Sequence, residues 1–201
     1  MAQLDRDFPL PMRDSSSVVA GDTEAVAVRP LTLADCAAYQ NFVGRLERND
    51  LRLRFASTVN FARDELCGRF LDIDHREEEA LAAIDSRGEI LGVARIHRLG
   101  PDEADIAIII RSDRKRRGLG RLLLDHLRTY AAGAGILRLR ADILRENYAM
   151  LTLARKFGFH AVGTGGIMAE VRLDLEPHAV PQAVATRALN PATVGGCSSP
   201  I

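Results

Sequence analysis

Two glycines and a run of cations between residues 111 and 121 are the clearest sign of chemistry in the sequence. Four successive cations, Arg114 to Arg117, precede Gly118 and Gly120 where a strand-like apolar run gives way to a helical repeat. A helix N-terminus carries partial positive charge, so this crowding of cations is unfavourable unless an anion binds there. The glycines also remove side chains that would separate phosphate oxygens from backbone N–H groups. The segment therefore predicts a phosphate-binding loop.

Other ligands fit this loop less well. The stretch Gly118-Leu-Gly-Arg-Leu-Leu123 lacks the third glycine of a dinucleotide fingerprint and does not follow the first strand. A GxxxxGK[ST] sequence is missing, which excludes a P-loop nucleotide hydrolase. Aromatic side chains that could stack on bases are missing nearby, which disfavours nucleic-acid binding. The alternative without a ligand is a solvated basic loop whose glycines serve a tight turn.

The elements that must position this loop alternate between helix and strand from about residue 23 to residue 176. The patterns predict strands at 25–28, 80–84, 90–96, 105–110, 137–143, 162–164 and 167–175, and helices after Thr32, Asn60, Gly118 and Asn147. Asn147 is expected to cap the last helix. The strand at 105–110 is almost continuously apolar, which predicts cover on both faces. This order of elements predicts a mixed α/β layer protein.

Length, charge and residue patterns limit the number of domains and the kinds of binding partner. The 201 residues suit one domain, and 27 basic against 27 acidic side chains argue against binding nucleic acid or a membrane through overall charge. Residues 1–22 and 177–201 lack periodic patterns, so we expect disordered tails around a domain at 23–176. The chain has no membrane-length apolar run and no secretory signal, and we expect a cytoplasmic protein.

The cysteines and histidines show no pattern typical of a metal site. Cys36, Cys67 and Cys197 are odd in number, far apart and without a CxxC pair, so we expect neither a disulfide framework nor cysteine-bound zinc. A reducing cytosol is the default environment for such thiols. The histidines lack ligand spacing, and no metal is expected. Cys36 and Cys67 also lack a neighbouring histidine, which disfavours transfer through an acyl-cysteine.

The loop and the last predicted helix together resemble the GNAT superfamily of N-acetyltransferases. The resemblance rests on Lys115-x-x-Gly118-x-Gly120 and on Asn147-Tyr-Ala-Met-Leu-Thr-Leu-Ala-Arg-Lys-Phe-Gly-Phe159. Lys115 departs from the glutamine or arginine that usually begins this loop. With residues 104–113, the sequence looks most like the acetyltransferase domain of bacterial protein lysine acetyltransferases, in which lysine at that position is not unusual. The resemblance covers about residues 28–175. It implies a mostly antiparallel central sheet with helices on both faces and splayed parallel strands at the cofactor site.

The resemblance also implies acetyl-CoA as co-substrate. Backbone amides of the loop would hold the pyrophosphate, the preceding strand would pair with the pantetheine arm, and an asparagine would bind near that arm. The corresponding residues are Ile108, Ile109, Ile110, Lys115, Arg116, Arg117, Gly118, Leu119, Gly120, Arg121 and Asn147. We expect direct transfer to a primary amine, with a protein lysine favoured over a small metabolite amine. The alternative hypothesis is a catalytically weak acyl-CoA-binding sensor; the oligomeric state is not predicted.

An amine must be neutral to attack a thioester, and at pH 7 only roughly one lysine in 2,500 is neutral. A general base is therefore expected. Related enzymes commonly carry a glutamate on the strand before the loop, and Asp105 occupies the matching position, with Glu103 as the fallback. Aspartate is shorter, so we expect a water to bridge it to the amine; a merely solvated strand residue is the alternative. The tyrosine that often protonates the leaving thiolate corresponds to Ala154, so no general acid is assigned.

Overall fold

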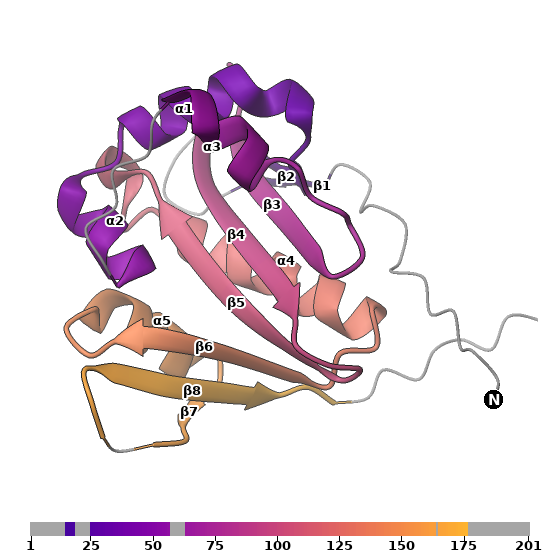
Figure 1. Cartoon of the computed structure of the whole chain (residues 1–201), viewed down its shortest axis with the longest axis vertical. Helices are drawn as coiled ribbons and strands as arrows, with labels where there is room; N and C mark the ends of the chain where they lie inside the picture. Colours follow the sequence, from indigo (N-terminus) through magenta and orange to yellow (C-terminus); the bar gives the residue numbers. More distant parts are fainter. Residues whose placement is uncertain (1–14, 19–24, 57–62, 164, 177–201) are drawn as a thin grey trace, which may run out of the picture.

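A computed structural model describes residues 15–18, 25–56, 63–163 and 165–176. These residues form an eight-stranded sheet in the order β1-β2-β3-β4-β5-β6-β8-β7 (Figure 1). The strands are β1 (Ser15–Val18), β2 (Ala25–Pro30), β3 (Glu78–Asp85), β4 (Ile90–Arg98), β5 (Glu103–Ile110), β6 (Arg138–Leu144), β7 (His160–Ala161) and β8 (Met168–Asp174). Neighbouring strands are antiparallel except β5 and β6. The predicted mixed, mostly antiparallel α/β fold is confirmed.

Helices cover both faces of this sheet. They are α1 (Cys36–Gly44), α2 (Arg48–Phe55), α3 (Arg63–Phe70), α4 (Leu119–Gly133) and α5 (Tyr148–Lys156), with 3-10 turns at Leu33–Asp35 and Ser112–Arg114. Successive strand residues point to opposite faces, which creates two cores. In β3, Leu81 and Ala83 face the core formed with α4 and α5, whereas Ala80 and Ala82 face the core formed with α1 and α3. No helix among the described residues is long and apolar enough to cross a membrane.

The long helix α4 packs through one apolar stripe. Its buried residues are Leu119, Leu123, Leu124, Leu127, Tyr130 and Ala131. From the helical repeat, the sequence predicts an inward stripe of Leu119, Leu122, Leu123, Leu127, Tyr130, Ala131 and Ala134. Leu122 and Ala134, expected to point inward, are only partly buried, and Leu124 is buried without having been predicted. Leu122 and Ala134 nevertheless pack against the same core. This packing fixes the start of α4, which directly follows the basic loop.

The parallel strands β5 and β6 pair over a short stretch and then separate. Their register joins only Glu103, Ala104 and Asp105 to residues 138–140 of β6. Beyond Asp105, β5 remains paired with β4 and β6 with β8, so each strand has a free edge on the gap between them. This confirms the splayed parallel strands. Ile108 and Ile110 pack against one core and Ile109 packs against the other, so both faces of this strand are covered as predicted, and the three residues remain partly exposed beside the gap.

Strand β1 lies within the segment 1–22, for which the sequence predicts a disordered tail. Its backbone pairs with β2 in antiparallel register, from Ser15 opposite Val28 to Val18 opposite Ala25. The prediction is wrong for these four residues, because pairing with a neighbouring strand creates this strand in the absence of an apolar pattern of its own. The rest of that segment, and the predicted tail at 177–201, lie outside the described residues.

Candidate active site

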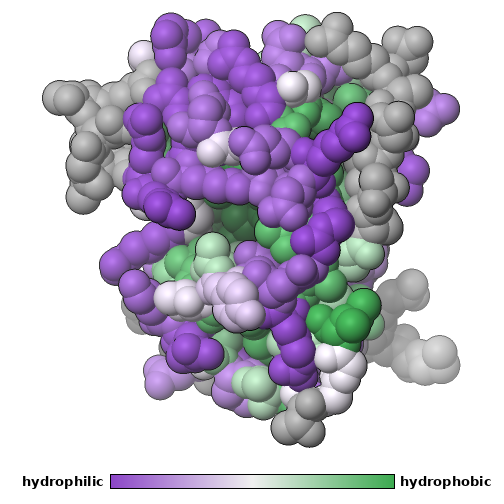
Figure 2. Space-filling model, turned by 90° about the vertical axis from the view of Figure 1, so that its left-hand side faces the viewer, coloured by the Kyte–Doolittle hydropathy of each residue, from purple (hydrophilic) through white to green (hydrophobic). Residues whose placement is uncertain are grey.

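A groove of about 890 Å³ follows the gap between β5 and β6. Residues 105–110 of β5 line it along one side, β6 and α5 line the other, and α2 forms a further wall. The basic loop and the start of α4 close one end, and Asp105 lies at the point where the strands begin to separate. Figure 2 shows hydrophobic surface in a hollow between hydrophilic regions. A groove with an apolar lining and a cationic end suits a long ligand with an anionic head.

The structure brings nearly all sequence-predicted site residues to this groove. Its lining includes Asp105, Ile108, Ile109, Ile110, Lys115, Arg116, Gly118, Leu119, Gly120, Arg121 and Asn147. Arg117 is the exception and does not line the groove. Glu103, the fallback for the base, also lies outside the lining, and its carboxylate is 3.9 Å from the guanidinium of Arg172.

The basic loop turns sharply into α4. Gly118 is the N-cap residue of that helix and has φ of 85°, a left-handed conformation that favours glycine, while Arg116 has φ of 61°. Gly118 has no side chain to cap the helix, and no side-chain hydrogen bond reaches the cap position. The N–H groups of the first helical turn lack partners within the helix. They are therefore available to bind an anion at the end of the groove.

Gly120 lies in the first turn of α4, close to α5. A Cβ atom added there would stand 3.2 Å from Cδ2 of Leu153. The glycine therefore lets the two helices approach each other beside the groove. The sequence predicts Gly120 for close approach of phosphate, and the structure adds this packing reason.

A buried arginine holds the base of the loop. Arg111 follows β5 and is 2% exposed, and its guanidinium donates to Asp113 at 2.7 Å and to Glu89 at 2.9 Å. The hydrogen bond from Arg111 holds the pKa of Glu89 below its ordinary value. Charge-assisted hydrogen bonds of this kind are stronger than neutral ones. They fix the point from which the loop leaves β5.

Helix α2, which the sequence analysis missed, is tied to the loop through Asp50. The carboxylate is almost fully buried and accepts hydrogen bonds from the hydroxyl of Ser112 at 2.6 Å and from Nζ of Lys115. The same hydroxyl accepts a hydrogen bond of 2.9 Å from the backbone N–H of Glu47. Lys115 thus reaches α2, and its side chain braces the loop from the side of the groove.

The opposite side of the groove also contacts α2. Arg52 forms an ion pair with Glu146, which lies between β6 and α5. Both side chains are at least 40% exposed, so this pair adds little to stability. It does link the two walls of the groove. Of the α2 residues at the site, Asp50 and Arg54 line the groove although no sequence pattern pointed to them.

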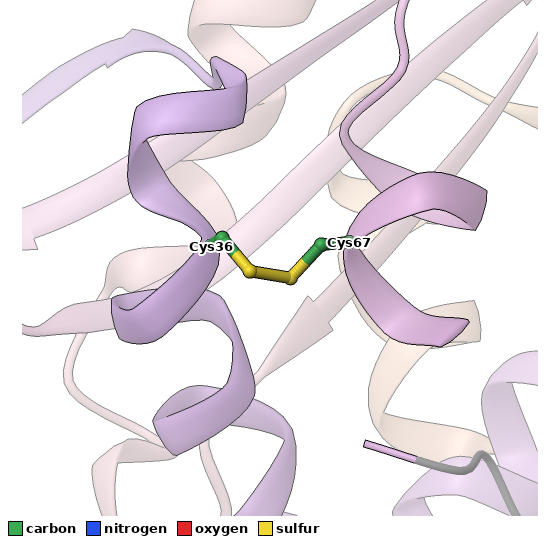
Figure 3. Close-up of a disulfide and its surroundings, with 2 residues drawn as sticks. All are labelled: Cys36 and Cys67. Carbon is green, nitrogen blue, oxygen red and sulfur yellow. A yellow bond between two sulfur atoms is a disulfide. The ribbon is translucent and has the colours of Figure 1, made fainter. Parts of the chain in front are cut away.

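A disulfide joins the helices that precede and follow α2 in the chain. Cys36 of α1 and Cys67 of α3 are bonded, with their Cα atoms 5.4 Å apart (Figure 3). The prediction that these cysteines form no disulfide is wrong. The two cysteines are 31 residues apart in the sequence, and only the packing of α1 beside α3 brings them together. The pairing could therefore not be predicted from their spacing. Disulfides are rare in a reducing cytosol. The bond therefore also disagrees with the expectation that these cysteines are in a reducing environment.

Asp105 is partly buried where β5 and β6 separate. Burial raises the pKa of its carboxyl above the ordinary value, although the nearby Arg140 acts in the opposite direction. A carboxylate with a raised pKa is better matched to taking up a proton near neutral pH. The geometry therefore allows Asp105 to act on a ligand in the groove, and its role as the base stays a prediction.

A general acid is as hard to assign in the structure as in the sequence. The described lining of the groove holds no tyrosine. Ala154 is buried in the core, and Tyr148 at the start of α5 is 75% exposed and outside the lining. Within the described ranges, no three His, Cys, Asp or Glu side chains are grouped to hold a metal ion.

Asn147 begins α5 as predicted. Its side-chain oxygen accepts a hydrogen bond of 3.1 Å from the backbone N–H of Met150, which confirms the helix cap. The side chain also lines the groove. With its oxygen engaged by the cap, the amide NH₂ group is left to donate to a ligand.

Comparisons with known proteins agree with this arrangement. The model of the acetyltransferase (GNAT) family matches residues 48–159. Acetyltransferase PA5475 of Pseudomonas aeruginosa is 27% identical over 142 residues, which cover 69% of this chain and 76% of that protein.

Solved structures show the same fold. The GNAT domain of S. lividans PAT has a TM-score of 0.74 and 24% identity, with 81% of this chain and 97% of that chain covered. The acetyltransferase yncA of Salmonella typhimurium, solved with acetyl-CoA, has a TM-score of 0.58 and 22% identity, with 79% and 98% covered.

Proposed function

The chain belongs to the acetyltransferase (GNAT) family and is an N-acetyltransferase, and we propose that it transfers acetyl from acetyl-CoA to a lysine side chain of a protein. One observation carries the proposal: the separation of β5 and β6 opens a groove that leads from the N-terminus of α4 to Asp105. A ligand in this groove has its anionic end on free N–H groups and its other end beside a carboxylate.

The residues along the groove fit acetyl-CoA. The N–H groups at the start of α4, where Gly118 and Gly120 leave room for a close approach, donate hydrogen bonds to the pyrophosphate oxygens. The free edge of β5 at Ile108–Ile110 offers backbone groups to the amide groups of the pantetheine arm, as an added strand would. Asn147 donates its NH₂ group to the same arm. Lys115 acts mainly by holding the loop in place, because its Nζ is already bound to Asp50.

The chemistry then takes place at the Asp105 end. The neutral amine nitrogen attacks the thioester carbonyl carbon; a C–N bond forms, the C–S bond breaks, and coenzyme A leaves as a thiolate. Asp105 takes the proton from the amine, directly or through a water. Its raised pKa supports this role, because the proton is held more firmly than on an ordinary aspartate.

The surface around Asp105 supports a large acceptor. Asp105, Arg140 and Arg172 stand in register across β5, β6 and β8, so their side chains share one face of the sheet. Alternate residues of β6 and β8 instead enter the core with α4 and α5. The shared face is polar and partly exposed, and no helix lies in front of β6 and β8 in Figure 1. A protein surface can therefore approach the base.

The experiment measures thiol release from acetyl-CoA with folded lysine-bearing proteins and with small primary amines at equal amine concentration. Mass spectrometry of the proteins then locates the acetyl groups. We expect release with proteins and acetylated lysines. Release with small amines alone would overturn the choice of acceptor, and binding of acetyl-CoA without any release would favour a sensor over an enzyme acting on these amines.

A further inference from the structure

Arg54 is a cation of the groove wall that has no anionic partner in the part of the chain that the structure describes. It lies in α2 and lines the groove. Its guanidinium makes no hydrogen bond or ion pair with the residues described in the structure; its contact is with the ring of the adjacent Phe55, 4.8 Å from the ring centroid. Other arginines nearby are paired, as Arg52 with Glu146 and Arg95 with Glu78.

The surroundings of Arg54 make this isolation unfavourable. Burial lowers the pKa of the guanidinium, and the nearby Arg95 acts in the same direction. Glu78 is engaged by Arg95 at 2.5 Å and forms no ion pair with Arg54. Asp105 acts on Arg54 electrostatically, also without an ion pair. A cation that is withdrawn from water without a partner carries a free-energy cost, which a bound anion relieves.

The position of Arg54 along α2 identifies which part of the ligand it meets. Asp50, one helical turn earlier, binds Ser112 and Lys115 of the basic loop. Arg54 lies on the same side of the helix as Asp50. Arg54 and Asp105 both line the groove, and the charge of Asp105 acts on Arg54. The acceptor amine is expected at this end. The cofactor phosphates are expected at the other end, so the anion that meets Arg54 belongs to the acceptor.

We propose that Arg54 binds a carboxylate of the acceptor, so that the enzyme selects primary amines that carry a carboxylate close to the amine. This inference rests on the proposed function, because it places the amine at Asp105. The two side chains then form a site of opposite charges for a zwitterionic ligand: the carboxylate of Asp105 faces the amine and the guanidinium of Arg54 faces the carboxylate. Since the two side chains do not pair with each other, the ligand enters between them.

Two kinds of acceptor carry a primary amine close to a carboxylate. One is a lysine of a protein with an aspartate or glutamate beside it, and the other is a free amino acid. The experiment therefore uses two matched pairs: a peptide with Lys-Glu against the same peptide with Lys-Gln, and an amino acid against its carboxamide. The kcat/KM values of the wild type and of Arg54→Gln are measured with each pair. Preference within the first pair identifies a protein acceptor, and preference within the second identifies an amino acid.

We expect the wild type to favour the carboxylate member of one pair by about 10- to 100-fold, as for a charge-assisted hydrogen bond. In Arg54→Gln this ratio falls to near one, and in Arg54→Lys, which keeps the charge but not the paired donors, it is intermediate. Arg48→Gln is the matched control: it removes the same charge from the exposed start of α2, outside the groove, and keeps the ratio. The calorimetric affinity for acetyl-CoA establishes that each variant is folded.

Different results would contradict the proposed function and the role of Arg54. If no amine is acetylated by the wild type, the proposed function is wrong. If both members of each pair react equally in the wild type, or if Arg54→Gln keeps the preference, the role of Arg54 is wrong while the proposed function stands.

Discussion

The hydroxyl of Ser112 donates a hydrogen bond of 2.6 Å to the carboxylate of Asp50, a residue 62 positions earlier in the chain. Lys115 donates to the same carboxylate. Helix α2 and the basic loop therefore form one unit at the cationic end of the groove. Arg54 lies one turn further along α2, and both Asp50 and Arg54 line the groove. We therefore expect the position of α2 to affect binding of the cofactor and of the acceptor.

Asp50→Asn tests this unit. The change keeps the shape of the side chain and removes the charge that holds Lys115. We expect unfolding free energy to fall by about 1–3 kcal/mol, because hydrogen bonds to a buried charged group are lost, and we expect weaker acetyl-CoA binding because the loop is less well held. Denaturant unfolding and calorimetry measure the two effects. Asp72→Asn, at an exposed position, is the control, and equal behaviour of the two variants would refute the bracing role of Asp50.

Gly120 offers a graded test of the phosphate end. In Gly120→Ala the new Cβ meets only the end of the Leu153 side chain at 3.2 Å, which can shift, so binding of acetyl-CoA is expected to fall only slightly. Gly120→Glu adds a negative charge and a long side chain at the start of α4, and binding is expected to be lost. Calorimetric titration with acetyl-CoA measures the affinity of both variants. Unchanged affinity in Gly120→Glu would show that phosphate does not bind at this helix.

The Cys36–Cys67 disulfide is open to direct chemical test. Thiol titration of the unfolded, unreduced protein is expected to find one free thiol among the three cysteines of the chain, and three after reduction. Removing the cross-link in Cys36→Ser/Cys67→Ser is expected to lower the unfolding free energy by about 2–4 kcal/mol. Cys197→Ser, which keeps the Cys36–Cys67 cross-link, is the control. Three reactive thiols before reduction would contradict the bond.

Asp105→Asn separates stability from activity. The pKa of Asp105 in the folded protein is raised above its ordinary value of 3.8, so the folded state holds its proton more tightly than the unfolded state. Above the folded pKa, ionisation therefore costs the folded protein stability, and this cost disappears below the unfolded pKa. Asparagine cannot ionise, so the variant is expected to melt at a higher temperature than the wild type at pH 7 and to lose that advantage in acid.

The same variant is expected to lose turnover, because the base is gone. In the wild type, the fall of kcat/KM on the acid side is expected at a pH above that of an ordinary aspartate, and Glu103→Gln is expected to keep both turnover and this profile. Full kcat in Asp105→Asn across the pH range would show that another group removes the proton.

The position of the basic loop, the helix α4 and the cap at Asn147 could be predicted from the sequence, because each depends on local signals. Glycines at a strand-to-helix turn, an apolar stripe and an N-cap residue all act within a few residues of one another. The resemblance to a known family then supplied the splayed strands, which no local pattern specifies.

Helix α2 was not predicted from the sequence because it lacks the apolar face of a typical amphipathic helix. Half of its residues, Arg-Asn-Asp-Leu-Arg-Leu-Arg-Phe, are charged, since the helix lines a groove and contacts β5 and β6 beside it. The roles of Asp50 and Arg54 depend on partners far along the chain or on a ligand. The same reason hid the disulfide: only the packing of α1 against α3 brings Cys36 to Cys67. Contacts of this kind follow from tertiary structure, and spacing alone does not reveal them.

The most direct test of the central claim is calorimetric titration of the protein with acetyl-CoA, followed by thiol release in the same sample on addition of a lysine-bearing protein. We expect saturable binding that Gly120→Glu abolishes, and thiol release that Asp105→Asn abolishes while binding persists. Absence of acetyl-CoA binding by the wild type would contradict the account.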